Sequence, residues 1–262
     1  MTTNHASQRL WIFSFDGALT APSADRSKAR LHRLTRQLLE ELASSPGERV
    51  AVLSSRSLED LVSRVPIPGV FLGGGCGTEW HIPGGESMTL SGRPKDLLME
   101  TRDELLPLLR DVAALPGITF DDRRWSAAIH AGGVAPKVKR TLDEQLEAIC
   151  RQRSVALYRY PDMVEIQFLP EITMEFGARA ICRFLKQEGP IICAGSDAND
   201  ATAIRWVLRQ GGSAISIGRR PIMAGVTAAV DIRSLVRQVR DLAGVSPQLP
   251  ARRPERRLNK AA

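Results

Sequence analysis

Ser14-Phe-Asp-Gly-Ala-Leu19, preceded by the apolar run Leu10-Trp-Ile-Phe13, is the stretch that decides the fold. An apolar run that stops at a polar glycine turn is typical of a buried strand that ends in a tight turn. Two similar boundaries follow along the chain: Val50-Ala-Val-Leu53 runs into Ser54-Ser-Arg56, and Pro190-Ile-Ile-Cys-Ala194 runs into Gly195-Ser-Asp-Ala-Asn-Asp200. One such boundary is usually a plain turn. Three of them, separated by helical segments, predict a parallel α/β sheet with polar residues at its strand ends.

Helical patterns separate these strands. Leucines recur at helical spacing after the first strand, at Leu31, Leu34, Leu38 and Leu42. Ser57, three residues before Asp60, predicts the capped start of the next helix. Val70-Phe-Leu72 predicts a third strand, which runs into a glycine-rich turn. Near the C-terminus we predict helices over about 176–187 and 231–242. Between them, a helix that follows the turn at 195–200 ends at about 209, and a strand over 213–217 comes next.

The middle of the chain has a different pattern. Helical spacing over 93–115 is followed by two strand-like stretches, a charged amphipathic helix over 136–153 and two more strands. This predicts a compact α+β unit inserted into the α/β frame. We therefore expect a parallel-sheet core over 10–84 and 172–245 and a smaller inserted domain over 85–171. Residues 1–9 are predicted to be a flexible N-terminus and 246–262 a basic disordered tail.

Composition limits the class of protein. The chain has 262 residues, 43% hydrophobic and 25% charged, which are globular proportions and exclude fibrous or fully disordered classes. Its four cysteines form no C-x-x-C pair, which favours reduced thiols over a disulfide or zinc framework. Residues 1–9 lack the apolar core of a signal peptide, and no apolar run approaches the roughly 18 residues of a membrane span. We expect a soluble, cytoplasmic protein without membrane contact.

The positive net charge is concentrated at the C-terminus. The formal net charge is +7, and residues 246–262 contribute five basic residues against one acidic residue. This tail is rich in proline and arginine, and its apolar residues have no regular spacing. We therefore predict a solvated extension. A nucleic-acid-binding module is an alternative that rests on this charge alone.

Taken together, the motifs resemble those of the haloacid dehalogenase superfamily, and within it the trehalose-6-phosphate phosphatases. The family's Asp-x-Asp-Gly-Thr-Leu motif aligns with 14–19, and its Ser-Gly-Arg with 54–56. Its Lys-Gly-x-Ala aligns with 176–180 and its Gly-Asp-Asp-x-Thr-Asp-Glu with 195–201. The resemblance covers roughly residues 10 to 243. It implies a Rossmann-like core with a cap domain, Mg²⁺ and phosphate release from trehalose 6-phosphate.

The resemblance also assigns site residues. It places the acid/base at Asp16, the phosphate-binding hydroxyl at Ser54 and the metal ligands at Asp197 and Asp200. Ser14 occupies the position of the nucleophile. Residues at the sugar-binding positions of the family are Glu79, Asp121, Arg123, His130 and Glu165.

Several substitutions relative to the family motifs affect residues that the family uses for catalysis. Ser14 replaces the nucleophilic aspartate, Phe176 the phosphate-binding lysine, Ser196 an acidic residue and Ala201 a glutamate. A serine hydroxyl is a poor nucleophile unless a base activates it, and phosphoryl transfer depends on charge neutralisation. Arg179, one turn beyond Phe176, could restore positive charge, but we expect it on the solvated helix surface. Weak or absent Mg²⁺ binding is also expected, because two carboxylates are missing.

We therefore predict a catalytically impaired pseudophosphatase that binds a sugar, a sugar phosphate or a regulatory partner in trehalose metabolism. Besides the nucleic-acid-binding module, two alternatives within the superfamily remain open. One is an active trehalose-6-phosphate phosphatase with a rearranged site. The other is a different sugar phosphatase of the same superfamily, such as a sucrose or mannosylglycerate-pathway enzyme.

Overall fold

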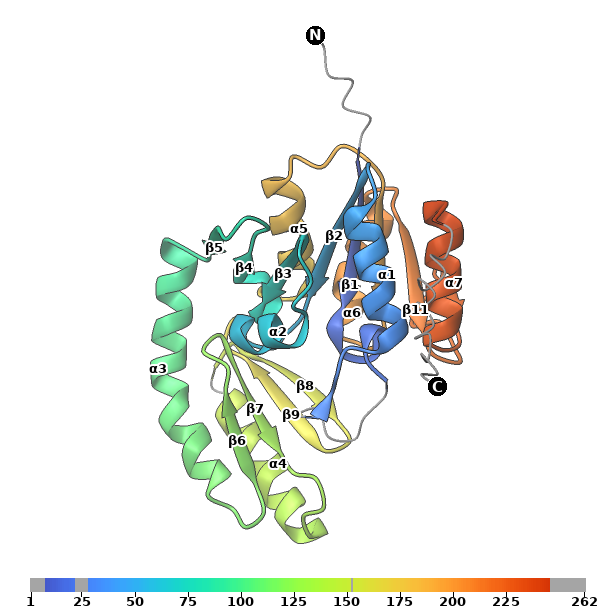
Figure 1. The fold of residues 1–262 in the computed structure, drawn as a ribbon. Coiled ribbons are helices and arrows are strands. Elements are labelled where there is room, and N and C mark those ends of the chain that lie inside the picture. Colours follow the sequence, from blue (N-terminus) through green and yellow to red (C-terminus); the bar gives the residue numbers. More distant parts are fainter. Residues whose placement is uncertain (1–7, 22–27, 152, 246–262) are drawn as a thin grey trace, which may run out of the picture.

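Two β-sheets organise the chain (Figure 1). The structure is a computed structural model that describes residues 8–21, 28–151 and 153–245. An eight-stranded sheet contains the first and last strands of the chain, and a four-stranded sheet is formed by the residues between them. The predicted α/β fold with an inserted α+β unit is therefore confirmed.

The eight-stranded sheet has the order β12-β11-β10-β1-β2-β3-β4-β5. Its strands are β1 (Arg9–Ser14), β2 (Glu48–Leu53), β3 (Val70–Gly74), β4 (Glu79–His81), β5 (Ser87–Thr89), β10 (Ile191–Gly195), β11 (Ser213–Ile217) and β12 (Thr227–Ala229). Neighbours from β12 to β3 pair in parallel, and β4 and β5 add an antiparallel edge. The motif-bearing strands β10, β1 and β2 are adjacent, so their carboxyl ends share one edge.

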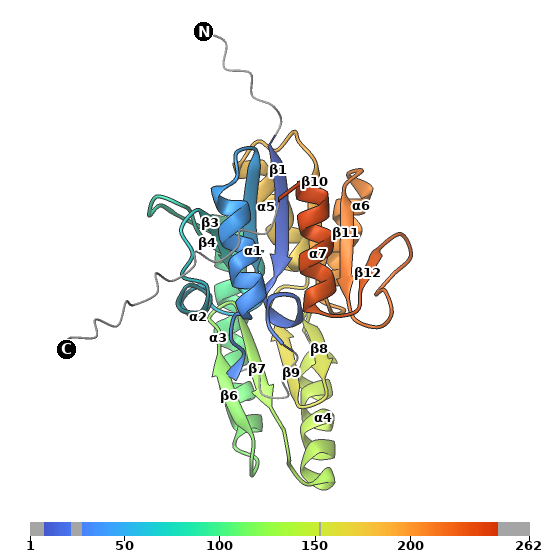
Figure 2. The same ribbon diagram turned by 45° about the vertical axis from the view of Figure 1, so that its right-hand side comes forward.

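Helices cover both faces of this sheet (Figure 2). They are α1 (Arg33–Ser44) and α7 (Ile232–Ala243) on one face, and α5 (Met174–Phe184) and α6 (Asp200–Arg209) on the other. The alternation of side chains along β1 explains both layers. Trp11 and Phe13 belong to the apolar cluster that includes the buried side chains of α1 and α7, whereas Leu10 and Ile12 belong to the cluster with α5 and α6.

The four-stranded sheet, with two helices, is called the cap below. Its order is β6-β7-β9-β8, and all its pairs are antiparallel. Its elements are α3 (Arg93–Ala113), β6 (Thr119–Asp122), β7 (Ser126–His130), α4 (Pro136–Arg151), β8 (Ala156–Tyr160) and β9 (Met163–Gln167). Asp121, Ala128, Glu165 and Tyr158 are successive cross-strand partners, so they share one face. This face lies toward the eight-stranded sheet, because Glu165 contacts Ser55.

Most predicted elements appear within a few residues of the expected bounds, including α2 (Leu58–Arg64), whose first turn Ser57 caps through the Asp60 amide. Three short strands, β4, β5 and β12, were not predicted. The expectation that Leu31 belongs to the first helix is wrong, because it pairs with Thr20 in an isolated bridge before α1 begins.

The predicted segment boundaries differ from the observed pairing at two places. β1 begins at Arg9, inside the N-terminal segment that was predicted to be flexible. β5 lies beyond residue 84, yet it belongs to the core sheet rather than to the cap. The division into domains otherwise stays a prediction, and the predicted tail over 246–262 lies outside the described residues.

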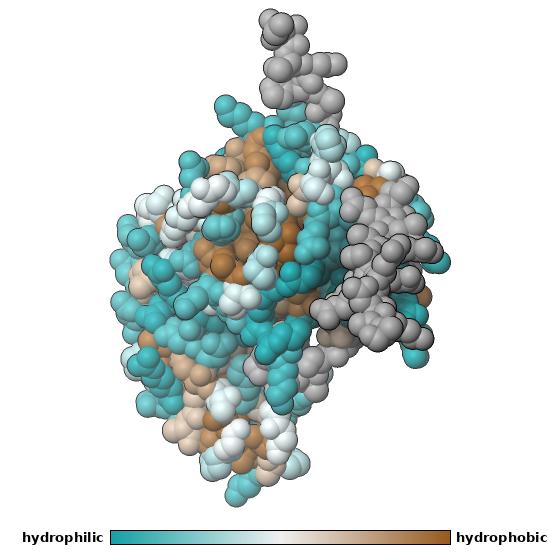
Figure 3. All heavy atoms as spheres, in the orientation of Figure 1, coloured by the Kyte–Doolittle hydropathy of each residue, from teal (hydrophilic) through white to brown (hydrophobic). Residues whose placement is uncertain are grey.

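The face seen in Figure 1 is mostly hydrophilic, with hydrophobic side chains gathered near β3 and β4 (Figure 3).

All four cysteines are free thiols. Within the described ranges, no helix combines the length and the apolarity that crossing a membrane requires.

Candidate active site

The polar ends of three neighbouring strands meet at one edge of the core sheet. β1 ends at Ser14, β2 leads into Ser54 and β10 ends at Gly195. The Ser196 hydroxyl donates a hydrogen bond to the backbone oxygen of Asp16 at 3.1 Å, across 180 positions of sequence. The structure therefore brings together the three motifs that the sequence predicts at this edge.

Ser14, at the predicted nucleophile position, is buried at the end of β1. Its hydroxyl lies 3.4 Å from the backbone oxygen of Asp16. It also hydrogen-bonds the Asp200 carboxyl and so favours the ionised form of that group. Ser54 is buried as well, and its hydroxyl oxygen accepts a hydrogen bond from the Arg56 amide at 3.2 Å.

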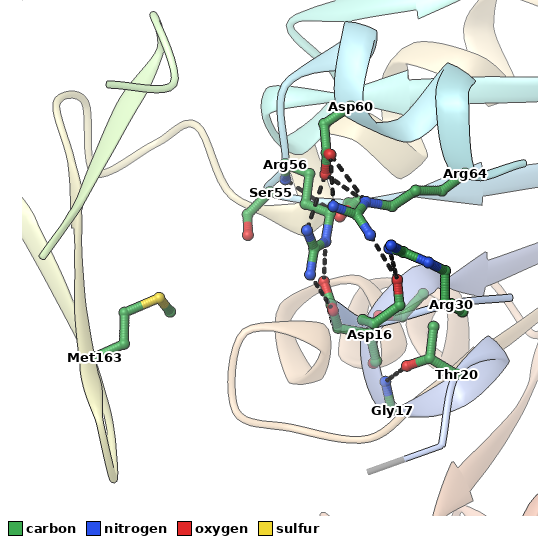
Figure 4. Close-up of polar contacts among 12 residues, drawn as sticks. Asp16, Gly17, Thr20, Arg30, Ser55, Arg56, Asp60, Arg64 and Met163 are labelled. Atoms are coloured by element: carbon green, nitrogen blue, oxygen red, sulfur yellow. Dashed lines mark hydrogen bonds and ion pairs between the residues drawn. The ribbon is translucent and has the colours of Figure 1, made fainter. Parts of the chain in front are cut away.

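Asp16, at the predicted acid/base position, is held by Arg56 (Figure 4). Nε of Arg56 donates to Oδ2 of Asp16 at 2.9 Å, and Nη2 donates to Oδ1 at 2.8 Å. This two-point geometry is the strong, oriented form of an arginine–carboxylate pair. Both oxygens of Asp16 therefore accept hydrogen bonds from Arg56.

Arg56 also joins a second carboxylate. Its Nη1 donates to Oδ2 of Asp60 at 2.8 Å, and Arg64 contacts the same carboxylate at 2.8 Å. Burial opposes ionisation of Arg56, but Asp16 and Asp60 outweigh it and raise the pKa of the guanidinium. Burial likewise opposes ionisation of Asp60, yet hydrogen bonds from Arg64 and Arg56 hold the pKa of that carboxyl below its usual value. The guanidinium of Arg56 is therefore fixed in place between two carboxylates.

The loop after β10 turns its carboxylates toward its own backbone. Oδ2 of Asp200 accepts hydrogen bonds from the amides of Ser196 at 2.7 Å and Asp197 at 3.3 Å. Oδ1 of Asp197 accepts from the amides of Asn199 at 2.9 Å and Asp200 at 3.1 Å. Burial, reinforced by the charge of Asp197, raises the pKa of Asp200 well above its usual range.

Hydrogen bonds within the protein already engage part of the donor set that the resemblance assigns to Mg²⁺, which disfavours binding of the ion. Mg²⁺ requires oxygen ligands in near-octahedral geometry. Oxygens of Asp197 and Asp200 already accept backbone hydrogen bonds, and both oxygens of Asp16 face Arg56. In the part of the chain that the structure describes, no three histidine, cysteine, aspartate or glutamate side chains gather as a metal site.

At the predicted position of the family's lysine, no positive charge from Phe176 or Arg179 of α5 faces the site. Phe176 lies in the first turn of α5 and packs, partly buried, against the apolar core. Arg179 pairs with Glu175 at 3.6 Å and leaves 54% of its side chain exposed. The expectation that Arg179 lies on the helix surface is confirmed.

Glu165 and Arg123, two cap residues at predicted sugar-binding positions, form an ion pair with each other. Glu165 has no exposed surface, and its Oε1 lies 3.5 Å from Nη1 of Arg123. Arg123 is also buried, and its Nε donates to Oδ2 of Asp121 at 2.8 Å. The hydroxyls of Ser55 and Ser126 donate to Glu165 at 3.1 and 3.5 Å. Arg123 therefore pairs with both carboxylates, the buried Glu165 and the partly exposed Asp121.

The remaining predicted residues lie around this cluster. Glu79 of β4 pairs with Arg124 at 2.8 Å. His130 lies on β7, two residues from Ala128 and hence on the same face of the cap sheet. Cys76, in the turn after β3, is buried with a positive φ of 57°. Burial, together with the charge of Glu165, raises the pKa of its thiol, so the thiol stays protonated.

Three residues near the site were missed by the sequence analysis. Arg56 and Ser55 are part of a quoted motif, but no role was assigned to either. Tyr158 of β8 is the cross-strand partner of Glu165. Burial, followed by the charges of Glu165 and Asp197, raises its pKa. The strand pattern of β8 gave no indication of this position.

The parallel sheet, the polar strand ends and the inserted cap define a protein of the haloacid dehalogenase class. A haloacid dehalogenase-like hydrolase from Bacteroides thetaiotaomicron has the same fold, with a TM-score of 0.64 at 13% identity over 90% of this chain and 99% of that one. The model of the trehalose-phosphatase family matches residues 12–229, and the chain belongs to that family.

Relatives within the family are similar over part of their length. The trehalose-phosphate phosphatase of Mycobacterium leprae is 29% identical over 131 residues, which are 50% of this chain and 30% of the relative. The alignment thus spans less than a third of that protein. The C-terminal domain of Candida albicans trehalose-6-phosphate phosphatase superposes with a TM-score of 0.75 at 15% identity, covering 92% of this chain and 93% of the domain. A crystal structure described as a trehalose-6-phosphate phosphatase related protein has a TM-score of 0.71 at 18% identity, covering 90% of this chain and 98% of that one.

Proposed function

We propose that this protein is a catalytically impaired trehalose-6-phosphate phosphatase-like protein. In this proposal it binds a sugar, a sugar phosphate or a regulatory partner in trehalose metabolism without turning over a phosphate ester. The observation that carries the proposal is Ser14 at the nucleophile position, buried at the end of β1 beside a loop whose acidic residue has become Ser196.

Three further features support this function. Phe176 stands at the position that aligns with the family's lysine, and no arginine of α5 takes over the charge of that lysine. Asp16 is held at both oxygens by Arg56. Because phosphoryl transfer depends on positioning and on charge neutralisation, loss of the nucleophile and of the cation removes most of its driving interactions.

The test is phosphate release from trehalose 6-phosphate with Mg²⁺, alongside calorimetric binding of trehalose and trehalose 6-phosphate. We expect measurable binding and barely detectable release. Several turnovers per second by the wild-type chain would contradict the proposal. A panel of other sugar phosphates tests the alternative that the protein acts on a different sugar ester.

An active phosphatase with a rearranged site is the second candidate, because the Ser14 hydroxyl hydrogen-bonds the Asp200 carboxyl. A serine next to a carboxylate is a possible activated nucleophile. The Ser14→Ala variant separates the two functions. If Ser14 attacks phosphorus, this variant loses the wild-type activity, and if Ser14 is inert, trace release is unchanged.

We also propose that Mg²⁺ binds weakly. A ligand that binds only the folded state stabilises it by RT ln(1 + [L]/Kd), so a tight ion raises the melting temperature clearly. We expect less than about 1 °C of change at sub-millimolar Mg²⁺, equal in wild type and Asp197→Asn. A strong rise in the wild type that Asp197→Asn abolishes would refute weak binding.

A further inference from the structure

Ser55 connects the core to the cap. It stands at the second position of Ser54-Ser-Arg56, just after β2, and is buried. Its side chain points away from the Asp16–Arg56 pair and toward β9, the strand that begins at Met163 (Figure 4). There its hydroxyl donates to Oε2 of Glu165 at 3.1 Å.

Glu165 is a fully buried carboxylate with few donors. Its Oε1 faces Nη1 of Arg123 and the hydroxyl of Ser126, each at 3.5 Å, and both of those residues belong to the cap. Among the described residues, the hydrogen bond from Ser55 links Glu165 to the core. At 3.1 Å it is shorter than the contacts of Glu165 with Arg123 and Ser126. A buried carboxylate oxygen that loses its donor is strongly penalised until water or a ligand replaces that donor.

We propose that Ser55 is a latch that holds the cap closed over the ends of β1, β2 and β10 through its hydrogen bond to Glu165. A ligand hydroxyl is the same kind of donor as a serine hydroxyl, so a polyol that reaches Oε2 of Glu165 must replace Ser55. This last step rests on the proposed function, whereas closure of the ligand-free protein does not.

Other contacts between the cap and the core fix the position of the cap less firmly. Arg124 pairs with Glu79 at 2.8 Å but leaves 57% of its side chain exposed, and exposed pairs contribute little. Trp125 packs against Gly75, where an added Cβ would lie 2.6 Å from Cδ1 of the indole. That contact is apolar and has no directional requirement. The hydrogen bond to the buried carboxylate therefore sets the closed position.

Alkylation of Cys76 measures opening of the cap. Cys76 is buried in the core beneath the cap, and its thiol pKa responds to burial first and then to the charge of Glu165. Cys193 is equally buried, in β10 between the core helices, so it reports unfolding of the core instead. Burial raises the pKa of both thiols, so both stay protonated and unreactive while they are buried.

The experiment uses the full ligand-free chain and a small alkylating reagent, with mass spectrometry to follow each cysteine. The Ser55→Ala variant is compared with Ser126→Ala, which removes a hydroxyl from the same carboxylate within the cap. We expect alkylation of Cys76 to rise roughly 10- to 100-fold in Ser55→Ala, with Cys193 unchanged and with little effect in Ser126→Ala. Equal effects of the two variants, or a parallel rise at Cys193, would overturn the latch.

Small-angle scattering supplies an independent readout of closure. Ser55→Ala is expected to increase the radius of gyration of the ligand-free protein, and Ser126→Ala to leave it at the wild-type value. An unchanged radius in Ser55→Ala, with unchanged alkylation of Cys76, would show that the cap stays closed without this hydrogen bond. Phosphatase activity enters neither measurement, so the latch can fail while the proposed function stands.

Discussion

The triple variant Ser14→Asp, Phe176→Lys, Ser196→Asp is expected to release phosphate from trehalose 6-phosphate on the order of 10³ times faster than the wild type. Ser14→Asp alone is expected to gain less than about tenfold, because groups that act as a unit are strongly non-additive. The nucleophile, the cation and the acidic metal ligand each depend on the other two. Phosphate release under saturating Mg²⁺ measures the gain.

The structure shows what the triple variant must accommodate. Ser196 contacts the backbone of Asp16 at 3.1 Å, so a longer side chain there has to turn away from β1. Phe176 is partly buried against the core, so lysine at this position loses apolar contact. Melting curves must therefore accompany the rates. Ser14→Asn, Phe176→Lys, Ser196→Asn is the matched control, because it keeps the lysine and the size of the two new acidic side chains but removes their negative charge.

A well-folded triple variant that is no faster than Ser14→Asp would contradict the assignment of these motifs. It would mean either that Phe176 and Ser196 do not occupy the positions of the missing groups or that another interaction blocks the reaction. The ion pair between Asp16 and Arg56 is the first such interaction to test, since it occupies both oxygens of the acid/base carboxyl.

Gly77→Ala is expected to destabilise the protein by about 3–5 kcal/mol, as measured by denaturant unfolding. Gly77 has a φ of 86°, and a Cβ there would lie 2.3 Å from Cα of Gly177 in α5. Backbone atoms cannot move aside as the end of a flexible side chain can. The loss therefore combines the strain of a left-handed residue with a clash between the turn after β3 and α5.

Gly84→Ala is the matched control for this prediction. Gly84 also has a positive φ, 103°, but a Cβ at this exposed position would meet no atom within 4 Å. Its loss should be about 1–2 kcal/mol, from backbone strain alone. The difference between the two variants isolates the close approach of Gly77 and Gly177. Equal losses would show that α5 can move away from the turn.

Some elements could be predicted because their pattern is local. The strand before Ser14 and the turn after it lie within about ten residues, as do the strand and turn at Ser54, so hydrophobic runs and turn residues suffice to identify them. Strands β4, β5 and β12 have three residues each, which is too short for a period-two pattern to be recognised. Their pairing depends on neighbours in the sheet.

The sequence by itself determined the fold class and predicted the positions of the motifs and of the substituted groups, because each of these predictions rests on residues close together in the chain. Only the tertiary structure decided the partners of those groups. Arg56 meets Asp16 from 40 positions away, and Ser55 meets Glu165 from 110 positions away. No local pattern encodes such contacts, since they exist only once parallel strands have aligned their ends and the cap has packed against them. The charge balance of the site is therefore a property of packing.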